Sequence, residues 1–162
     1  MIMVLAVPVL TSCSVPTGGV AGVTVDATGA VIAVISTCTH PVDGATLYDS
    51  SESGDQEILT RWQSMEDTNR SVVSLPITGG AGTGIAPVST YRDLPTTELS
   101  VYGWTRDNST SAEHVTFVPG DLAGLGPGQV LTGPWYDDDG VARHRIVPIG
   151  DLHDVACEFT GP

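Results

Sequence analysis

The chain contains no lysine, so all six of its cationic side chains are arginines. A lysine is essential to the Walker A nucleotide loop, to Schiff-base enzymes and to Ser-x-x-Lys acyl-enzymes. The absence of lysine therefore excludes all three. The chain also lacks the G-x-S-x-G motif of serine hydrolases and the H-E-x-x-H motif of zinc proteases. We accordingly predict no catalytic residue, no enzyme activity and no cofactor.

Positive charge is scarce, since 6 arginines face 19 acidic residues and the formal net charge is −13. Nucleic-acid binding needs clustered cations, so we do not expect a nucleic-acid partner. The same imbalance leaves an anionic membrane with no electrostatic hold on the chain. Any membrane attachment must therefore come from a hydrophobic or lipid anchor. High net charge also favours a soluble monomer.

Metal-ligand spacing is also missing. His144 and His153 lie near acidic residues of the C-terminal third, and imidazole with carboxylate is a ligand set for divalent metals. However, no tight spacing joins these residues, and the acidic run 137–139 lacks the alternate-position ligands of a calcium loop. An acidic hairpin turn explains that run equally well. We therefore predict no metal site.

Short β-strands are the main pattern of the chain. The clearest hairpin joins 20–25 to 30–37 through the turn Asp26-Ala27-Thr28-Gly29. The second of these runs is continuously β-branched, which indicates burial on both faces. In 98–106, Leu99, Val101, Gly103 and Thr105 alternate with Tyr102 and Trp104. Other strands are expected at 45–49, 57–65, 71–77, 114–118, 129–132, 141–149 and 154–159.

These segments amount to about eight or nine short strands separated by turns, without a convincing helix, which is typical of an all-β sandwich or barrel. By strand number and spacing, we predict a single immunoglobulin-like β-sandwich. The Cys-Trp-Cys hallmark of that fold is loosely met, because Trp62 and Trp104 lie between Cys38 and Cys157.

Residues 1–10 form an apolar run, MIMVLAVPVL, that is too short to span a bilayer as a helix. Leu10-Thr11-Ser12-Cys13 follows and resembles the lipobox that ends the signal peptide of bacterial lipoproteins. The chain departs from that pattern in having no cation before the apolar run. A buried first strand is the alternative, although Pro8 interrupts the run and no polar alternation is seen. The all-arginine cation set is associated with high-GC genomes such as those of actinobacteria.

The resemblance implies a lipid-modified Cys13 on the extracytoplasmic face of the cell membrane. It divides the chain into a signal peptide at 1–12, a lipidated cysteine with its tether at 13–19, and a β-sandwich domain at 20–162. Two or three acyl chains on one cysteine hold a protein firmly, because each buried CH₂ contributes about 0.8 kcal/mol. The membrane is then a partner through the lipid on Cys13.

Two cysteines remain, Cys38 and Cys157, and an even number in an exported chain predicts one disulfide. It would join an early strand to the last one. Two buried free thiols are the alternative. A third interpretation is a catalytic thiol at Cys157, near His153 and Asp154, but a nucleophile and its base must be adjacent in space rather than in sequence.

Aromatic residues make up only 6% of the chain, so most of them are needed for the core. Tyr102, Trp104, Trp135 and Tyr136 are the candidates for stacking on a sugar or peptide ligand. We expect a non-enzymatic binding or interaction module of the cell envelope, with an envelope protein or cell-wall partner. The alternatives are a hydrolase with a dispersed site that includes His144 and His153, and a purely structural envelope protein.

Overall fold

The computed structural model describes residues 15–51, 56–63, 72–78, 93–136 and 139–160, so the expected signal peptide and Cys13 lie outside the described residues. The described chain is mostly β and has a nine-stranded sheet, which confirms the all-β, sandwich-like prediction. The elements are β1 Thr17–Val25, β2 Val31–Thr37, β3 Gly44–Asp49, β4 Glu57–Gln63, β5 Val72–Pro76, β6 Leu99–Trp104, β7 Ser111–Phe117, α1 Pro119–Leu122, β8 Gln129–Tyr136, β9 Ala142–Pro148, the 3₁₀ turn η2 Ile149–Asp151 and α2 Leu152–Phe159.

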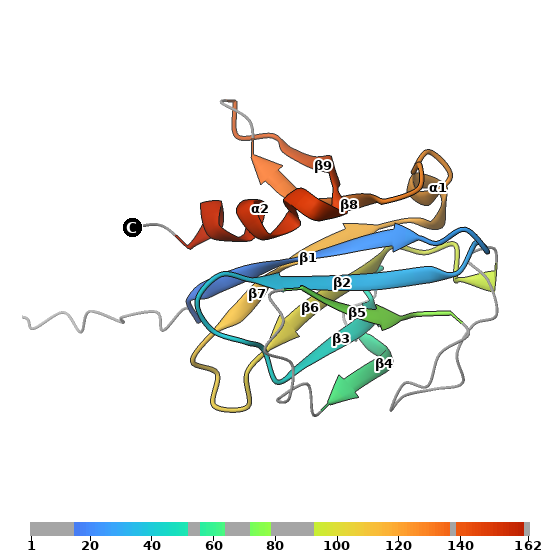
Figure 1. Cartoon of the computed structure of the whole chain (residues 1–162). Coiled ribbons are helices and arrows are strands. Elements are labelled where there is room, and N and C mark those ends of the chain that lie inside the picture. The colour runs from blue at the N-terminus through green and yellow to red at the C-terminus, as the bar shows by residue number, and fades with distance from the viewer. Residues whose placement is uncertain (1–14, 52–55, 64–71, 79–92, 137–138, 161–162) are drawn as a thin grey trace, which may run out of the picture.

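Strand β1 is the branch point of the sheet. Seven strands follow the path β4-β3-β6-β7-β1-β2-β5, and β8 pairs with both β1 and β9. The first residues of β1 pair in parallel with β7, while Gly22 and Val23 pair with β8 in antiparallel. The path curls over itself and brings β6 against β2. A Cβ built on Gly103 of β6 would lie only 3.2 Å from Cγ2 of Ile35 in β2. Figure 1 shows β1 and β2 in front of β3 and β6, with α2 along β1.

The predicted β1–β2 hairpin forms with a full antiparallel register from Gly19–Thr37 to Val25–Val31. Asp26 organises its turn, because Oδ1 accepts hydrogen bonds from the backbone N–H of Thr28 at 2.8 Å and of Ala30 at 3.0 Å. The side-chain hydrogen bond from Thr28 is the main cause that lowers the pKa of Asp26 below its usual value. Gly29 takes a φ of 86°, a conformation that glycine adopts readily.

The hairpin is buried on both faces, as its β-branched run predicted. Ala21 and Ala33 face a large core, whereas Val20 and Val34 on the opposite face enter a second, smaller core. The smaller core is completed by β8, β9 and α2, through Val130, Val147, Leu152, Val155 and Ala156. The hairpin therefore separates the two cores and is shared by both.

The prediction of a last strand at 154–159 is wrong, because Leu152–Phe159 is the helix α2. The apolar residues Leu152, Val155, Ala156 and Phe159 recur at the three- and four-residue spacing of a helix face. The first three of these are at most 3% exposed. The predicted strand started at Asp154 and so omitted Leu152. Without Leu152, the apolar residues Val155, Cys157 and Phe159 alternate with their neighbours as in a strand. Within the described segments, no helix has the length and apolarity required to cross a membrane.

The boundary expected between tether and domain is also corrected. Thr17, Gly18 and Gly19 belong to β1 rather than to a free tether. The carbonyl of Pro16 accepts a hydrogen bond from Ser111 N–H at 3.0 Å, and that of Gly18 accepts one from Cys38 N–H at 3.0 Å. Glycine is required at residue 19, because a Cβ there would lie 2.9 Å from Cα of Thr37. Glycine here serves close strand packing and not chain flexibility.

Cys38 and Cys157 form the predicted disulfide, with Cα atoms 4.9 Å apart and a sequence separation of 119. Cys38 directly follows β2, and Cys157 lies in α2, so the bond joins a strand end to a helix and not to a last strand. This position differs from the bond between two sheets in an immunoglobulin domain. Cys157 is therefore not a free thiol, although His153 Nε2 lies 3.9 Å from its sulfur.

The double substitution Cys38→Ser with Cys157→Ser is expected to lower the free energy of unfolding by about 2–5 kcal/mol, because the bond closes a long loop. Urea unfolding followed by circular dichroism measures the loss, and hydrogen exchange should show the earliest opening in α2. The reduced parent chain is the control and should match the double variant. Unchanged stability in both would contradict this role of the bond.

Candidate functional site

Tyr102 and Trp104 lie on the outer face of β6, as the alternation in this segment predicted. Leu99, Val101 and Gly103 point into the large core and are buried, whereas Tyr102 and Trp104 are half-buried. The two rings therefore lie on one side of a rigid strand, at positions about 7 Å apart along it. Such spacing on a rigid element suits successive contacts with one ligand.

Strands β3 and β4 extend this surface. Thr46 of β3 pairs with Tyr102 on one side and with Arg61 of β4 on the other, so these three residues form a row across the strands. The Tyr48 ring lies edge-on to the Tyr102 ring, with centroids 5.9 Å apart and an interplanar angle of 74°. We name this surface the aromatic face and define it by Tyr48, Arg61, Tyr102 and Trp104, while Thr46 is buried under it.

The indole of Trp104 is fixed in place. Its Nε1–H donates a hydrogen bond to Thr46 Oγ1 at 3.0 Å. A Cβ on Gly44, the paired residue of β3, would lie 2.7 Å from Trp104 Cη2, so only glycine gives the indole this position. The guanidinium carbon of Arg61 lies 6.0 Å from the ring centroid, at the outer range of a cation–π contact. The ring is therefore positioned before any ligand arrives.

Two hollows meet at Tyr102, which lines both. The His114 hollow has a volume of about 300 Å³ and is lined by Tyr48, Gln56, Tyr102, Ser111, Ala112, Glu113 and His114. The Arg61 hollow has a volume of about 330 Å³ and is lined by Arg61, Tyr102, Trp104, Thr105, Arg106 and Asn108. Each is near the lower limit of ligand pockets, which is about 300 Å³.

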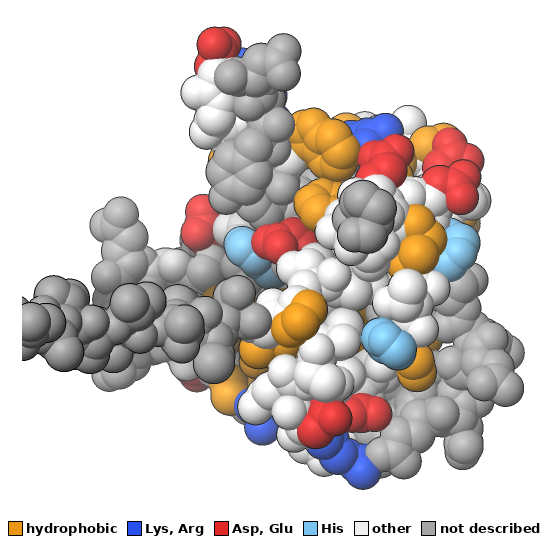
Figure 2. Space-filling model, turned by 90° about the vertical axis from the view of Figure 1, so that its left-hand side faces the viewer, with side chains coloured by type: hydrophobic (Ala, Val, Ile, Leu, Met, Phe, Trp, Pro, Cys, Tyr) orange, Lys and Arg blue, Asp and Glu red, His pale blue; other side chains and the backbone are white. Residues whose placement is uncertain are grey.

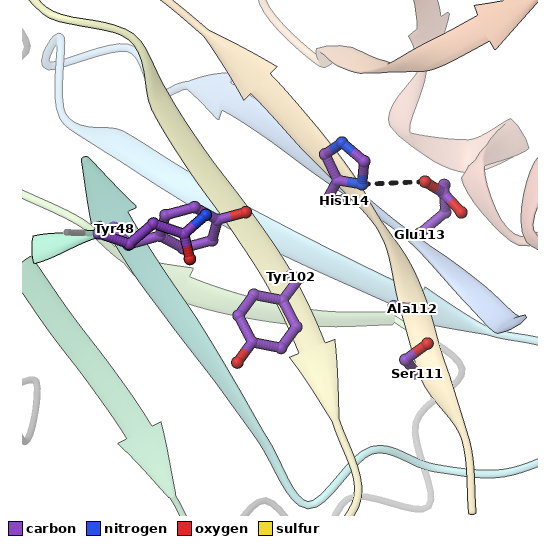
Figure 3. A pocket seen from close by; sticks show the side chains of 7 residues that line it. Tyr48, Tyr102, Ser111, Ala112, Glu113 and His114 are labelled. Carbon is purple, nitrogen blue, oxygen red and sulfur yellow. Dashed lines mark ion pairs between the residues drawn. The ribbon is translucent and has the colours of Figure 1, made fainter. Parts of the chain in front are cut away.

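An ion pair lies at the rim of the His114 hollow, where His114 Nδ1 is 2.9 Å from Glu113 Oε1. Figure 3 shows this pair on β7, with the Tyr102 ring on the neighbouring strand. The hydrogen bond to Glu113 raises the pKa of His114 above its usual 6.5, although partial burial opposes the shift. The hollow therefore contains an imidazole that holds its proton more strongly than a free histidine.

Two of the six cations of the chain, Arg61 and Arg106, line the Arg61 hollow together with Tyr102 and Trp104. The Nε atom of Arg61 is buried and has no hydrogen-bond partner within the described residues. The guanidinium of Arg61 lies over the ring of Trp104. The hollow therefore offers a cationic side chain beside a tryptophan.

The loop between β6 and β7 forms one wall of the Arg61 hollow and is internally braced. Thr105 Oγ1 donates to the carbonyl of Thr110 at 2.9 Å and accepts from its N–H at 3.0 Å. Hydrogen bonds from Ser109 lower the pKa of Asp107 below its usual value. Asn108 has a positive φ of 55°, which asparagine tolerates. In Figure 2, which views the end of the sandwich near this loop, basic and acidic side chains lie side by side.

The other two aromatic candidates do not join the aromatic face. Trp135 of β8 packs edge-on against Phe159 of α2, with centroids 5.5 Å apart. Arg145 covers it at 4.9 Å and pairs with Glu158 at 3.1 Å. Trp135 therefore has a packing role between β8 and α2. Tyr136 ends β8, and its side chain lies outside the described part of the chain.

The histidines weighed as metal ligands do not line either hollow. His144 lies against Gly133, where an added Cβ would meet its ring at 3.0 Å, and His153 lies in α2 beside the disulfide. Among the residues that the structure describes, no group of three or more His, Cys, Asp or Glu is placed to hold a metal ion. The acidic residues at 137 and 138 lie outside that part.

Sequence reasoning missed Tyr48, Arg61, Glu113 and His114 as site residues. The segment 44–49 alternates in the same way as 98–106, so Thr46 and Tyr48 were recognisable as one outward row. Their place beside Tyr102 depends on the pairing of β3 with β6, which crosses more than fifty residues of chain. No local pattern contains that register.

Comparison with known protein families, curated proteins and solved structures gave no match to this chain.

The substitution Glu113→Gln is expected to bring the pKa of His114 down toward 6.5, because it removes the carboxylate that holds the proton. Histidine NMR signals recorded against pH measure this. The raised pKa stabilises the folded chain below pH 6.5, and this contribution disappears as the pH rises through the folded value. The pair is partly exposed, so the loss is about 0.2–1 kcal/mol at low pH.

Glu158→Gln is the matched control for this titration, because it breaks a different ion pair, with Arg145, and leaves His114 untouched. An identical His114 titration curve in the parent and in Glu113→Gln would refute the assignment of the raised pKa to Glu113.

Proposed function

We propose that this chain is a lipid-anchored, extracytoplasmic binding module of a bacterial cell envelope. Acyl chains on Cys13 hold the protein at the membrane, and the aromatic face binds the ligand. The lipobox-like residues 10–13 support the anchor. The Cys38–Cys157 bond supports the location, because disulfides persist in oxidising compartments outside the cytoplasm.

The binding role depends on one observation, the meeting of two hollows at Tyr102 on the aromatic face. Half-buried rings fixed by packing lose little entropy when a ligand stacks on them. Trp104 is fixed by its hydrogen bond to Thr46, and Tyr102 by the core-facing residues on either side of it in β6. Sites built on strands are also more precisely positioned than sites on loops.

A cell-envelope hydrolase is the alternative, and Ser111, Glu113 and His114 do line one hollow. A serine nucleophile needs its base within about 2.6–3.2 Å. Three residues of extended strand span about 10 Å, and Figure 3 shows the Ser111 hydroxyl well along β7 from the imidazole of His114. This row does not present a nucleophile with its base, so we favour binding.

The substitution Cys13→Ser is expected to move the chain from the membrane fraction to the soluble extracytoplasmic fraction, because it removes the acyl acceptor. Fractionation of cells that produce the tagged parent and variant measures this, and mass spectrometry of the parent should find the lipid on Cys13. Cys38→Ser with Cys157→Ser is the control and should stay at the membrane. A Cys13→Ser chain that still sediments with membranes would refute the anchor.

The double substitution Tyr102→Ala with Trp104→Ala is expected to abolish capture of the ligand in the envelope, because it removes both stacking surfaces. Photo-crosslinking from intact cells, followed by mass spectrometry of what is attached, measures the loss. Trp135→Phe is the matched control, since it changes an aromatic residue away from the aromatic face. Equal capture by all three chains would show that the ligand does not bind at this face.

A further inference from the structure

We infer that the ligand is a short oligosaccharide with one carboxylate group, whose acidic ring lies in the Arg61 hollow and whose next ring lies in the His114 hollow. This inference rests on the proposed binding function and deepens it. It names the chemical class of the ligand and its direction along β6.

The size of the two hollows sets the length of the ligand. Volumes of about 300 and 330 Å³ are too small for a large ligand in either hollow, yet Tyr102 is shared between them. A ligand made of two joined ring units matches this division. Each ring then has its own aromatic contact, with Trp104 in the Arg61 hollow and Tyr102 at the junction.

The lining groups favour a sugar over a peptide. A pyranose ring has an apolar C–H face that stacks on an aromatic ring and a rim of hydroxyls that need donors and acceptors. Both hollows combine rings with polar side chains, including the amides of Gln56 and Asn108. A peptide that adds a strand would need a free sheet edge. The hollows lie on the face of β6, which is paired on both sides by β3 and β7.

Charge sets the direction of the ligand. Arg61 lines its hollow with the guanidinium beside Trp104, so a carboxylate bound in this hollow gains a charge-assisted hydrogen bond. At the other end, the charges of Glu113 and His114 compensate each other in their ion pair, and Glu113 already occupies the imidazolium. The lining of the Arg61 hollow includes arginines and no acidic residue, so the acidic ring fits that hollow better.

The charge of the whole chain limits the ligand to few negative groups. A net charge of −13 repels polyanions such as nucleic acids, which also stack on aromatic rings. One carboxylate on an otherwise neutral saccharide uses the local cation without that repulsion.

The test uses two probes that differ in one negative charge and one methyl group: the disaccharide N-acetylglucosaminyl-N-acetylmuramic acid and its methyl ester. Titration calorimetry with the full-length chain should give an affinity for the acid at least about tenfold higher than for the ester, as one charge-assisted hydrogen bond implies. Raising the salt concentration should reduce this preference. Arg61→Gln should remove the preference, so that the acid and the ester bind this variant with equal affinity.

Arg145→Gln is the matched control, because Arg145 also lies over a tryptophan but away from the aromatic face, and it should keep the preference. Arg61→Lys provides a second variant if Arg61→Gln folds poorly, and it should weaken acid binding partially, since an ammonium lacks the guanidinium fork. Equal affinity for both probes in the parent chain, or a preference that survives Arg61→Gln, would overturn the charge assignment and leave the binding face standing.

Failure of both disaccharides to bind would overturn the saccharide inference as a whole. The proposed function is tested separately by comparing crosslinking of the parent with that of the Tyr102→Ala, Trp104→Ala variant. A protein that is captured by the parent and lost in this variant would then be a ligand of a different class at the same face. A single-stranded nucleic acid captured there would contradict the charge argument.

Discussion

The burial of the β1–β2 hairpin on both of its faces is the constraint on which the rest of the structure depends. Val20 and Val34 on one face and Ala21 and Ala33 on the other are almost fully excluded from water. A strand buried on both faces needs a cover on each side. Strands β3, β6 and β7 of the curled sheet cover one face, and β8, β9 and α2 cover the other. Small residues in the hairpin let these layers approach closely.

The disulfide follows from that arrangement. Helix α2 has only eight residues, too few to be stable alone, and its buried side chains contact the hairpin. Joining Cys157 to Cys38 at the end of β2 links the helix to the strand that it covers. The bond therefore maintains the smaller core, and the packing of Trp135 against Phe159 belongs to the same unit.

The aromatic face depends on the other layer. Because Leu99, Val101 and Gly103 of β6 are committed to the large core, Tyr102 and Trp104 must point outward. Gly44 and Thr46 of β3 then accept the indole. Arg61 lines one hollow and the His114–Glu113 ion pair lines the other, so the two hollows differ in their charge.

The amino-acid sequence by itself determined the β-rich class, the hairpin with its Asp26 turn, the outward side of β6 and the pairing of Cys38 with Cys157. These are local periodicities or follow from the small number of cysteines. The helical spacing of the apolar residues in α2 is also present in the sequence, although a strand was predicted there. Only the tertiary structure decided that Tyr48 and Arg61 share the face of Tyr102, and that Trp135 does not. Strand register and layer order join residues far apart in the chain, and no local pattern records which distant partner a side chain meets.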